Sequence, residues 1–345
     1  MKKNLLIGLA LVCGVALLGG GVAAWREFYD RKLPNFTGSF SFYVTPDMEP
    51  EAVLDTILAS GKVRREGSLR RRVGALEKMR VGHYTLDANS SSMYAARMLS
   101  HGWQTPVSLS ISGAIRSPKV LARKIGAQML TDSATVADFL YSDDSLAAYG
   151  IDTTLLFTKV IPASYEVKWT AGVREIMDLL VRESDKWWTP ERLSKARAQG
   201  LTRAEAVTLA SIVDGETRYV PEQPDIAGVY LNRLRKGMKL QADPTVAYCY
   251  GYTLRRILKA HLDVDSPYNT YKYPGLPPGP ISCPPKSCLE AVLSPGEHSY
   301  LFFCASPEFD GSHRFAVSYS DHLVNARAFQ AALTKRLRER AVADK

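Results

Sequence analysis

Residues 209–218 read LASIVDGETR, and this stretch decides how the C-terminal half of the chain is interpreted. Leu209, Ile212 and Val213 are spaced i, i+3 and i+4, so in an α-helix they lie on one face. Their apolar side chains predict that this face packs against a core. Glu216 follows at i+7 on the same face, which puts a carboxyl group where the helix is otherwise hydrophobic.

A carboxylate on an apolar helix face is costly to ionise, so we expect the pKa of Glu216 to be raised. A glutamic acid that is partly protonated near neutral pH suits the cleavage of a glycosidic bond, where it acts as general acid. The alternative is a structural glutamate, buried and paired with an arginine. Asp214 points to another face and is spaced i, i+4 with Arg218, which predicts a solvated ion pair and a poor second catalytic carboxylate.

The sequence around this stretch predicts where its helices begin and end. Thr202 and Glu205 form a capping box ahead of the Glu216 helix. Asp225 is expected to cap the next helix, which closes with a basic turn and Gly237. A final helix is expected over residues 320–340.

The N-terminal half mixes short strands with short helices, which predicts an α+β fold. Residues 64–72 are a charged run, interpreted as a solvated helix face. Residues 155–167 are expected to be extended. Strands are predicted near 38–46, 81–86 and 107–111, with helices at 50–61 and 91–102.

Two downstream loops, LQADPTV and SPYNTY, carry polar and aromatic side chains of the kind that line sugar sites, where rings stack and hydroxyls need partners. A proline-rich loop, GLPPGPI, follows them and is expected to wall a groove. The alternative is that these are ordinary structured loops. The candidate substrate-binding residues in the two loops are Gln241, Asp243, Thr245, Tyr268, Asn269, Thr270 and Tyr271.

The composition of the 345 residues, 46% hydrophobic and 23% charged, is that of a globular protein. The net charge of +9 suits an anionic partner, but no nucleic-acid-binding motif is present. No P-loop, GxGxxG or GxSxG motif and no metal-ligand spacing occurs, so we expect no cofactor and no metal. Cys283 and Cys288 either form a disulfide or remain as partly buried thiols, like Cys249 and Cys304.

Residues 5–25 are 21 uncharged residues, long enough to cross a bilayer at about 20 residues per span. We therefore expect a cytoplasmic tail at 1–4, a single membrane anchor at 5–25 and a stalk at 26–37. A cleaved signal peptide is the alternative, because Val22-Ala23-Ala24 resembles a cleavage site.

The motifs in their order resemble a known family. LASIVDGET, NRLRKGMKLQADPTVAYCYG, SPYNTY and GLPPGPIS follow one another as in the YceG-like endolytic murein transglycosylase (MltG) family. The segment VGHYTLDANSSS with MLSHG is similar to that family's LysM-like subdomain. The chain departs from the family pattern at Asp214, Gly215 and Ala242, and Ser112-Gly113-Ala114 stands near the place of a Pro-Glu-Gly block.

The resemblance implies a LysM-like module at 38–112 joined to a catalytic α+β domain at 113–341. It implies cleavage of the MurNAc–GlcNAc β-1,4 bond in nascent peptidoglycan strands, leaving 1,6-anhydro-MurNAc ends and terminating strand elongation. Glu216 occupies the position of the family's catalytic glutamate. Glu166 matches a family carboxylate, and Asn232 opens the NRLRKG block, so both are added to the candidate substrate-binding residues.

The family mechanism needs one carboxyl group, because the substrate's own C6 hydroxyl is the nucleophile. The implied location is the inner membrane, single-pass, with the catalytic domain on the periplasmic side. Peptidoglycan strands and peptidoglycan synthases are the expected partners. The alternatives are a muramidase that uses water and a second carboxylate such as Asp243, and a non-catalytic peptidoglycan-binding scaffold.

Overall fold

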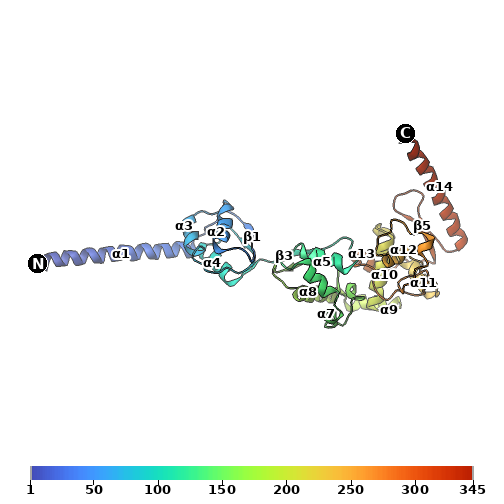
Figure 1. Cartoon of the computed structure of the whole chain (residues 1–345), viewed down its shortest axis with the longest axis horizontal. Coiled ribbons are helices and arrows are strands. Elements are labelled where there is room, and N and C mark those ends of the chain that lie inside the picture. The colour runs from blue at the N-terminus through green and yellow to red at the C-terminus, as the bar shows by residue number, and fades with distance from the viewer. Residues whose placement is uncertain (1, 344–345) are drawn as a thin grey trace. The chain divides into compact units, whose positions relative to one another are not determined.

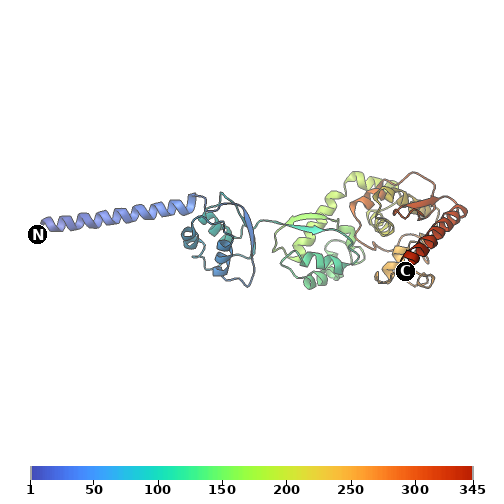
Figure 2. The same ribbon diagram turned by 90° about the horizontal axis from the view of Figure 1, so that it is seen from above.

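The structure, a computed structural model, describes residues 2–343, and side chains are described for residues 13–339. The chain divides into two compact units, each taken here by itself (Figures 1 and 2). The N-terminal unit runs to Ser108 and also takes in Glu166–Ala171, and the C-terminal unit comprises the rest. The division falls within β3 (Val107–Ile111) and β4 (Ala163–Val167), which pair with each other.

The chain opens with a long helix, α1 (Lys2–Lys32). Across the part of the chain that the structure describes, no helix is long and apolar enough to cross a membrane. Residues 5–12 of the predicted anchor lie outside those whose side chains are described. The predicted stalk begins as helix, because α1 continues to Lys32.

The N-terminal unit is built on one antiparallel pair of strands, in which Phe42 faces Tyr84. Alternate residues of both strands are buried, so one face of the pair packs on the helices and forms a small core. Strands and helices lie where the sequence predicts them. Their bounds are β1 (Phe40–Val44), α2 (Pro50–Ala59), α3 (Glu66–Arg72), β2 (Gly82–Leu86) and α4 (Ser92–His101).

The charged run at 64–72 is not wholly a solvated face, contrary to the sequence prediction. Arg71 and Arg72, at the end of α3, contact the carboxylate of Asp30 at 2.9 and 3.0 Å. Asp30 lies in α1 and is only 1% exposed. The run therefore fastens α3 to the end of α1, because a buried carboxylate requires charged partners.

The C-terminal unit contains the core that holds Glu216. Helix α10 (Arg203–Glu216) packs against α11 (Gln223–Arg235), α12 (Asp243–Cys249) and α13 (Lys286–Leu293). The same unit also contains a second group of helices that contact one another, α5 (Pro118–Gly126), α6 (Ser133–Leu140), α7 (Asp143–Ala147) and α8 (Val173–Trp187). The 3₁₀ turn η1 (Leu156–Lys159) contacts both α8 and α10, and the remaining elements are α9 (Pro190–Ala198), η2 (Val220–Glu222) and η3 (Lys259–His261).

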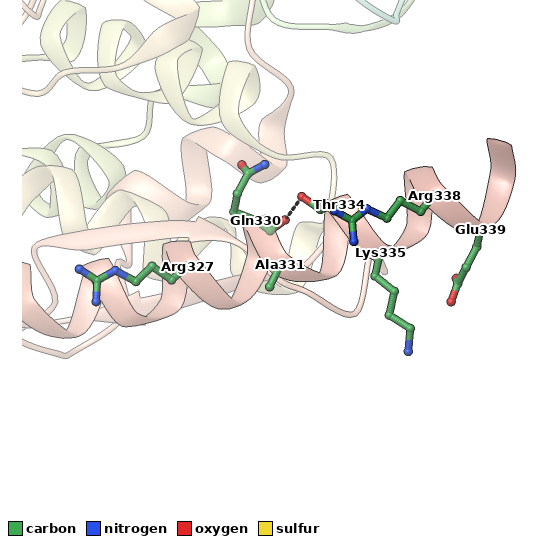
Figure 3. Close-up of a pocket in the computed structure, with 7 residues that line it drawn as sticks. All are labelled: Arg327, Gln330, Ala331, Thr334, Lys335, Arg338 and Glu339. Atoms are coloured by element: carbon green, nitrogen blue, oxygen red, sulfur yellow. Dashed lines mark hydrogen bonds between the residues drawn. The ribbon is translucent and has the colours of Figure 1, made fainter. Parts of the chain in front are cut away.

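The unit closes with a hairpin and a helix. Strands β5 (Phe302–Ala305) and β6 (His313–Ala316) pair antiparallel, and α14 (Tyr319–Ala343) packs on both. A hollow of about 530 Å³ lies along α14 and is lined only by side chains of that helix, Arg327, Lys335 and Arg338 among them (Figure 3). Since no second element closes it, this hollow is an open helix surface rather than a site.

Two local predictions in this unit are wrong. Residues 155–167 are not one extended piece, because η1 comes first and buries Leu156 and Phe157. Asp225 is not the cap of α11, since the helix begins earlier, at Gln223, and Asp225 lies in its first turn.

Candidate active site

Glu216 is the last residue of α10. Thr202 caps the other end, and its side chain and that of Glu205 form the predicted capping box. Leu209, Ile212 and Val213 are fully buried, which confirms the predicted apolar face. The helix stops after Glu216 because Thr217 takes an extended conformation. Glu216 therefore lies where a buried helix face meets a cavity, and its own side chain is partly buried.

Tyr230 holds one oxygen of this carboxyl group. Its phenol donates a hydrogen bond of 2.5 Å to Oε1 of Glu216. Tyr230 lies in α11, is 1% exposed, and meets the ring of Phe303 edge-on, with 5.8 Å between centroids. Packing thus fixes the phenol, and the phenol fixes the carboxyl group.

Burial raises the pKa of Glu216 to about 7. The Tyr230 hydrogen bond opposes this shift because it favours the ionised form, whereas the negative charge of Asp243 adds to it. The position at the C-terminus of α10 also disfavours a negative charge, because the helix dipole is negative there. The group is therefore poised between its acid and base forms near neutral pH.

Glu216 opens onto a cavity of about 240 Å³. Gly215 and Pro244 lie in its wall, and the wall is tight there: a Cβ on Gly215 would lie 2.4 Å from Cβ of Pro244. Helices α10 and α12 approach so closely only because residue 215 has no side chain. The other lining residues are Arg116, Ser211, Asp214, Asp243, Ala247, Tyr252, Leu254, Ile257 and Ser282.

Asp243 is the predicted loop residue that lines the same cavity as Glu216. It begins α12, and its Oδ1 accepts a hydrogen bond of 2.7 Å from the phenol of Tyr271. Tyr271 thereby orients Asp243, and burial with the Asp243 charge raises the pKa of the Tyr271 phenol. The two loop motifs meet at this bond.

The other polar residues of the two loops hold the loops together. Thr245 and Thr270 are buried and joined by a hydrogen bond of 2.9 Å between their hydroxyls. Gln241 adopts a φ of +50° and donates its backbone N–H to the carbonyl of Thr270. Asn269 is fully buried and donates to the carbonyls of Leu262 and Val264.

The remaining candidates also lie outside the cavity wall. Asn232 donates to the carbonyls of His298 and Tyr300, at 2.8 and 3.1 Å. The ring of Tyr268 packs against that of Tyr248 in a tilted arrangement, with 4.5 Å between ring centroids. Glu166 is an exposed residue of β4 and belongs to the N-terminal unit. The buried amides and hydroxyls of these residues form hydrogen bonds with protein partners and thereby hold the loops in place around the cavity.

Asp214 is not the surface ion pair that the sequence predicted. Among the residues with described side chains, no ion pair within 4.0 Å joins it to Arg218. Its carboxylate accepts a hydrogen bond of 3.3 Å from Ser282 and lines the Glu216 cavity. Burial raises its pKa, because the end of α10 is covered by the segment that carries Ser282.

Sequence reasoning missed Tyr230, Arg116 and Tyr252. Tyr230 belongs to the apolar face of α11 and gave no chemical signal. Arg116 lies 100 residues before Glu216, outside every motif that the sequence singled out. The cysteines are free in this structure, so Cys283 and Cys288 are buried thiols rather than a disulfide. No group of three His, Cys, Asp or Glu side chains able to hold a metal occurs among the described residues.

A family model described as the YceG-like family matches residues 42–328. The chain belongs to the YceG-like family. This confirms the family predicted from the ordered motifs. A crystal structure of a YceG-like protein from Listeria monocytogenes shares 27% sequence identity with the chain, at a TM-score of 0.53, covering 82% of this chain and 98% of that one. The mixed α+β fold is thus also that of a solved YceG-like protein.

Curated relatives carry the name endolytic murein transglycosylase. The Bacillus subtilis (strain 168) protein is 34% identical over 151 residues, which are 44% of this chain and 41% of the relative. The Streptococcus pneumoniae (strain D39) protein is 30% identical over 200 residues, 56% of this chain and 35% of the relative. This YceG-like chain therefore matches less than half the length of these curated relatives.

Proposed function

We propose that this YceG-like protein is a lytic transglycosylase that cleaves the MurNAc–GlcNAc β-1,4 bond within peptidoglycan strands and leaves 1,6-anhydro-MurNAc ends. The observation that carries the proposal is the carboxyl group of Glu216, which has a pKa of about 7, a fixed hydrogen-bond donor on Oε1 and an open cavity beside it. The names of the relatives support the choice of murein as substrate.

In the proposed reaction Glu216 is first an acid and then a base. The protonated group gives its proton to the glycosidic oxygen as the bond from that oxygen to C1 of MurNAc breaks. The C6 hydroxyl of the same MurNAc ring then bonds to C1 and loses its proton to the ionised carboxylate. One bond to C1 is lost and one is formed, and the proton passes from O6 to the departing GlcNAc, so no water is consumed.

The hydrogen bond from Tyr230 supports different roles for the two carboxyl oxygens of Glu216. Oε1 is occupied by the Tyr230 phenol, which leaves Oε2 to carry the exchanging proton. A nucleophile that belongs to the substrate needs no second carboxylate to activate water, because its effective concentration is already high. Tyr230 is a positioning residue in this scheme.

A muramidase is the second candidate, and a specific observation favours it: Asp243 lines the same cavity as Glu216. In that reaction Asp243 activates a water molecule, and the product has a reducing end. The hydrogen bond from Tyr271 holds Oδ1 of Asp243 in place beside the cavity. The two reactions differ in product mass by one water.

Mass spectrometry of digested peptidoglycan tests the proposal. We expect anhydro-muramoyl ends from the wild-type protein and none from Glu216→Gln, with the variant folded and still bound to glycan. Reducing ends that take up oxygen from ¹⁸O-labelled water support the muramidase. A folded wild-type protein that binds glycan and yields neither product supports a non-catalytic scaffold.

The proposal extends to the setting of the reaction. Residues 38–112 act as a LysM-like module, residues 113–341 as the catalytic domain, and the uncharged segment 5–25 as an anchor that keeps the domain on the periplasmic side of the inner membrane. Cleavage near the membrane ends strand elongation beside the synthases. Cell fractionation with protease applied from the periplasm tests this arrangement, and release of the protein in salt washes contradicts it.

A further inference from the structure

Arg116 lies in the wall of the Glu216 cavity, and its backbone is fixed on both sides. The preceding Ile115 is fully buried, and its carbonyl accepts a hydrogen bond of 2.9 Å from the N–H of Cys283. The following Ser117 caps α5, its hydroxyl accepting from the N–H of Val120 at 3.3 Å. Because the backbone on both sides of Arg116 is held in place, its side chain can reach only one part of the cavity wall.

The guanidinium of Arg116 lies over the ring of Tyr252, 4.7 Å from its centroid. The ring is itself held, because its hydroxyl donates to the carbonyl of Ile281 at 2.7 Å. This cation–π contact holds the guanidinium at the cavity and uses none of its N–H groups as hydrogen-bond donors, so they are available to a ligand.

Arg116 makes no close ion pair with a described side chain, although its charge acts on Asp214 and partly opposes the effect of burial on the pKa of that carboxyl group. Among the residues with described side chains Arg116 has no carboxylate within 4.0 Å and donates no hydrogen bond to the protein. Arg233, the guanidinium that acts electrostatically on Glu216, differs, because it is buried and donates to the carbonyls of Leu301 and Leu240. Arg116 is thus the cation of this cavity whose N–H groups are available to a ligand.

The rest of the cavity is acidic. Asp214, Glu216 and Asp243 line it, and Arg116 is the basic residue of the same wall. A negatively charged part of a ligand is repelled by the carboxylates and has one favourable place, beside Arg116. The planar fork of a guanidinium matches a carboxylate with two parallel hydrogen bonds, which a neutral sugar hydroxyl cannot accept.

We propose that Arg116 binds a carboxylate carried by the muramoyl residue of the substrate, so that the enzyme prefers strands with acidic substituents. The inference rests on the proposed function. Two sources of this carboxylate exist in murein. One is the stem peptide attached to the lactyl group, and the other is the lactyl group itself, which is a free carboxylate only after the peptide has been removed.

Three forms of the same glycan strands test the inference: untreated, chemically amidated so that the carboxylates are neutral, and treated with an amidase that leaves the lactyl carboxylate. We expect wild-type kcat/KM to fall by about two- to fivefold on amidated strands, the range of one exposed ion pair. Arg116→Gln should show the same loss on untreated strands and no further loss on amidated ones. Activity retained on the amidase-treated strands identifies the lactyl carboxylate, and activity lost there identifies the peptide.

Arg218→Gln is the matched control, because Arg218 also acts on Asp214 but does not line the cavity. It should keep the preference for acidic strands. The inference is overturned if Arg116→Gln equals the wild type on untreated strands, or if the variant falls as far below the wild type on amidated strands as it does on untreated ones. A wild-type protein that releases no anhydro ends from any of the three strands contradicts the proposed function instead, so the two failures are distinct.

Discussion

The phenol of Tyr230, which is buried, and the carboxyl group of Glu216, which is partly buried, form a hydrogen-bonded pair with 2.5 Å between Oη and Oε1. The two residues come from consecutive helices, α10 and α11, whose packing brings the end of one beside the middle of the other. The bond favours the ionised carboxylate, while burial favours the protonated form, and burial is the larger effect. The pKa of about 7 is the outcome of that opposition.

Tyr230→Phe removes the donor and keeps the packing. Without the hydrogen bond the ionised form loses support, so the pKa of Glu216 rises further and the high-pH limb of kcat/KM moves to higher pH. We also expect kcat to fall by roughly 3- to 30-fold, since one oxygen is no longer held. A pH profile of anhydro-end release measures both effects.

The control for this variant is Tyr165→Phe. Tyr165 is a buried phenol that donates to a backbone carbonyl, that of Ile161, and not to Glu216. Its removal should leave the pH limb in place. A Tyr230→Phe limb that stays at the wild-type pH contradicts the role given to the phenol.

Glu216→Gln should stabilise the fold at alkaline pH. The pKa of Glu216 is about 7 in the folded state and 4.5 as its ordinary value. Below pH 4.5 the carboxyl group is protonated in both the folded and the unfolded state and does not change the free energy of unfolding. As pH rises from 4.5 to 7 the unfolded state ionises first and is favoured, so stability is lost, by up to about 3 kcal/mol above pH 7.

Urea unfolding of the wild type and Glu216→Gln at pH 4 and pH 8 measures this pH-dependent difference in the free energy of unfolding. The variant should gain roughly 1–3 kcal/mol at pH 8 and little at pH 4, since glutamine cannot ionise and the wild-type side chain is partly solvated. A gain that is equal at the two pH values means that titration of Glu216 is not its source. The gain at pH 8 is the stability that the site gives up for its chemistry.

Gly215→Ala should lower both stability and activity. Alanine usually stabilises a helix by about 1 kcal/mol relative to glycine. At this position the new Cβ would lie 2.4 Å from that of Pro244, so α10 and α12 must separate. We expect a net loss of about 1–3 kcal/mol in the free energy of unfolding and a lower kcat, because Asp243 moves with Pro244.

Gly67→Ala provides the comparison for thermal and urea unfolding. Gly67 lies in α3, where an added Cβ meets only the end of the flexible Arg71 side chain, at 3.5 Å. That substitution should be neutral or stabilising. If Gly215→Ala behaves in the same way, the close contact of α10 with α12 is not a constraint on the site.

Asp243→Asn separates the two candidate reactions. In the transglycosylase Asp243 raises the pKa of Glu216, so the variant should move the high-pH limb of kcat/KM to lower pH and lose roughly 3- to 10-fold at pH 8. Anhydro ends remain the product. A muramidase would instead lose the base that activates water, at a cost of about 10²–10⁴-fold at every pH.

Asp265→Asn is the matched control for that experiment. Asp265 also accepts a tyrosine hydrogen bond, from Tyr273 at 2.6 Å, but it does not line the cavity. Its pH profile should superimpose on that of the wild type. A common shift in both variants would point to a general effect of charge instead of the cavity.

The elements with a strong local signal were predictable. The capping box of Thr202 and Glu205, the helices predicted at 50–61 and 91–102, and the strand predicted near 38–46 depend on a few adjacent residues, and each lies in the structure as predicted. For the two loops, the sequence indicated which polar residues matter but not which partners their side chains would have. Thr245 and Asn269 stay predicted substrate-binding residues; what the sequence did not reveal is that their side chains are buried and hydrogen-bonded within the loops, because a turn needs its own hydrogen bonds.

The sequence by itself determined which carboxyl group lies at the end of an apolar helix face, because the 3.6-residue period is local. Only the tertiary structure decided what surrounds that group. Tyr230 comes from the next helix and Arg116 from 100 residues upstream, while Asp214, expected on the surface, is covered by the segment of Ser282. The burial, the hydrogen bond and the nearby charges at Glu216 come from segments that are distant in sequence. The pKa of Glu216 is therefore set only when those segments pack together.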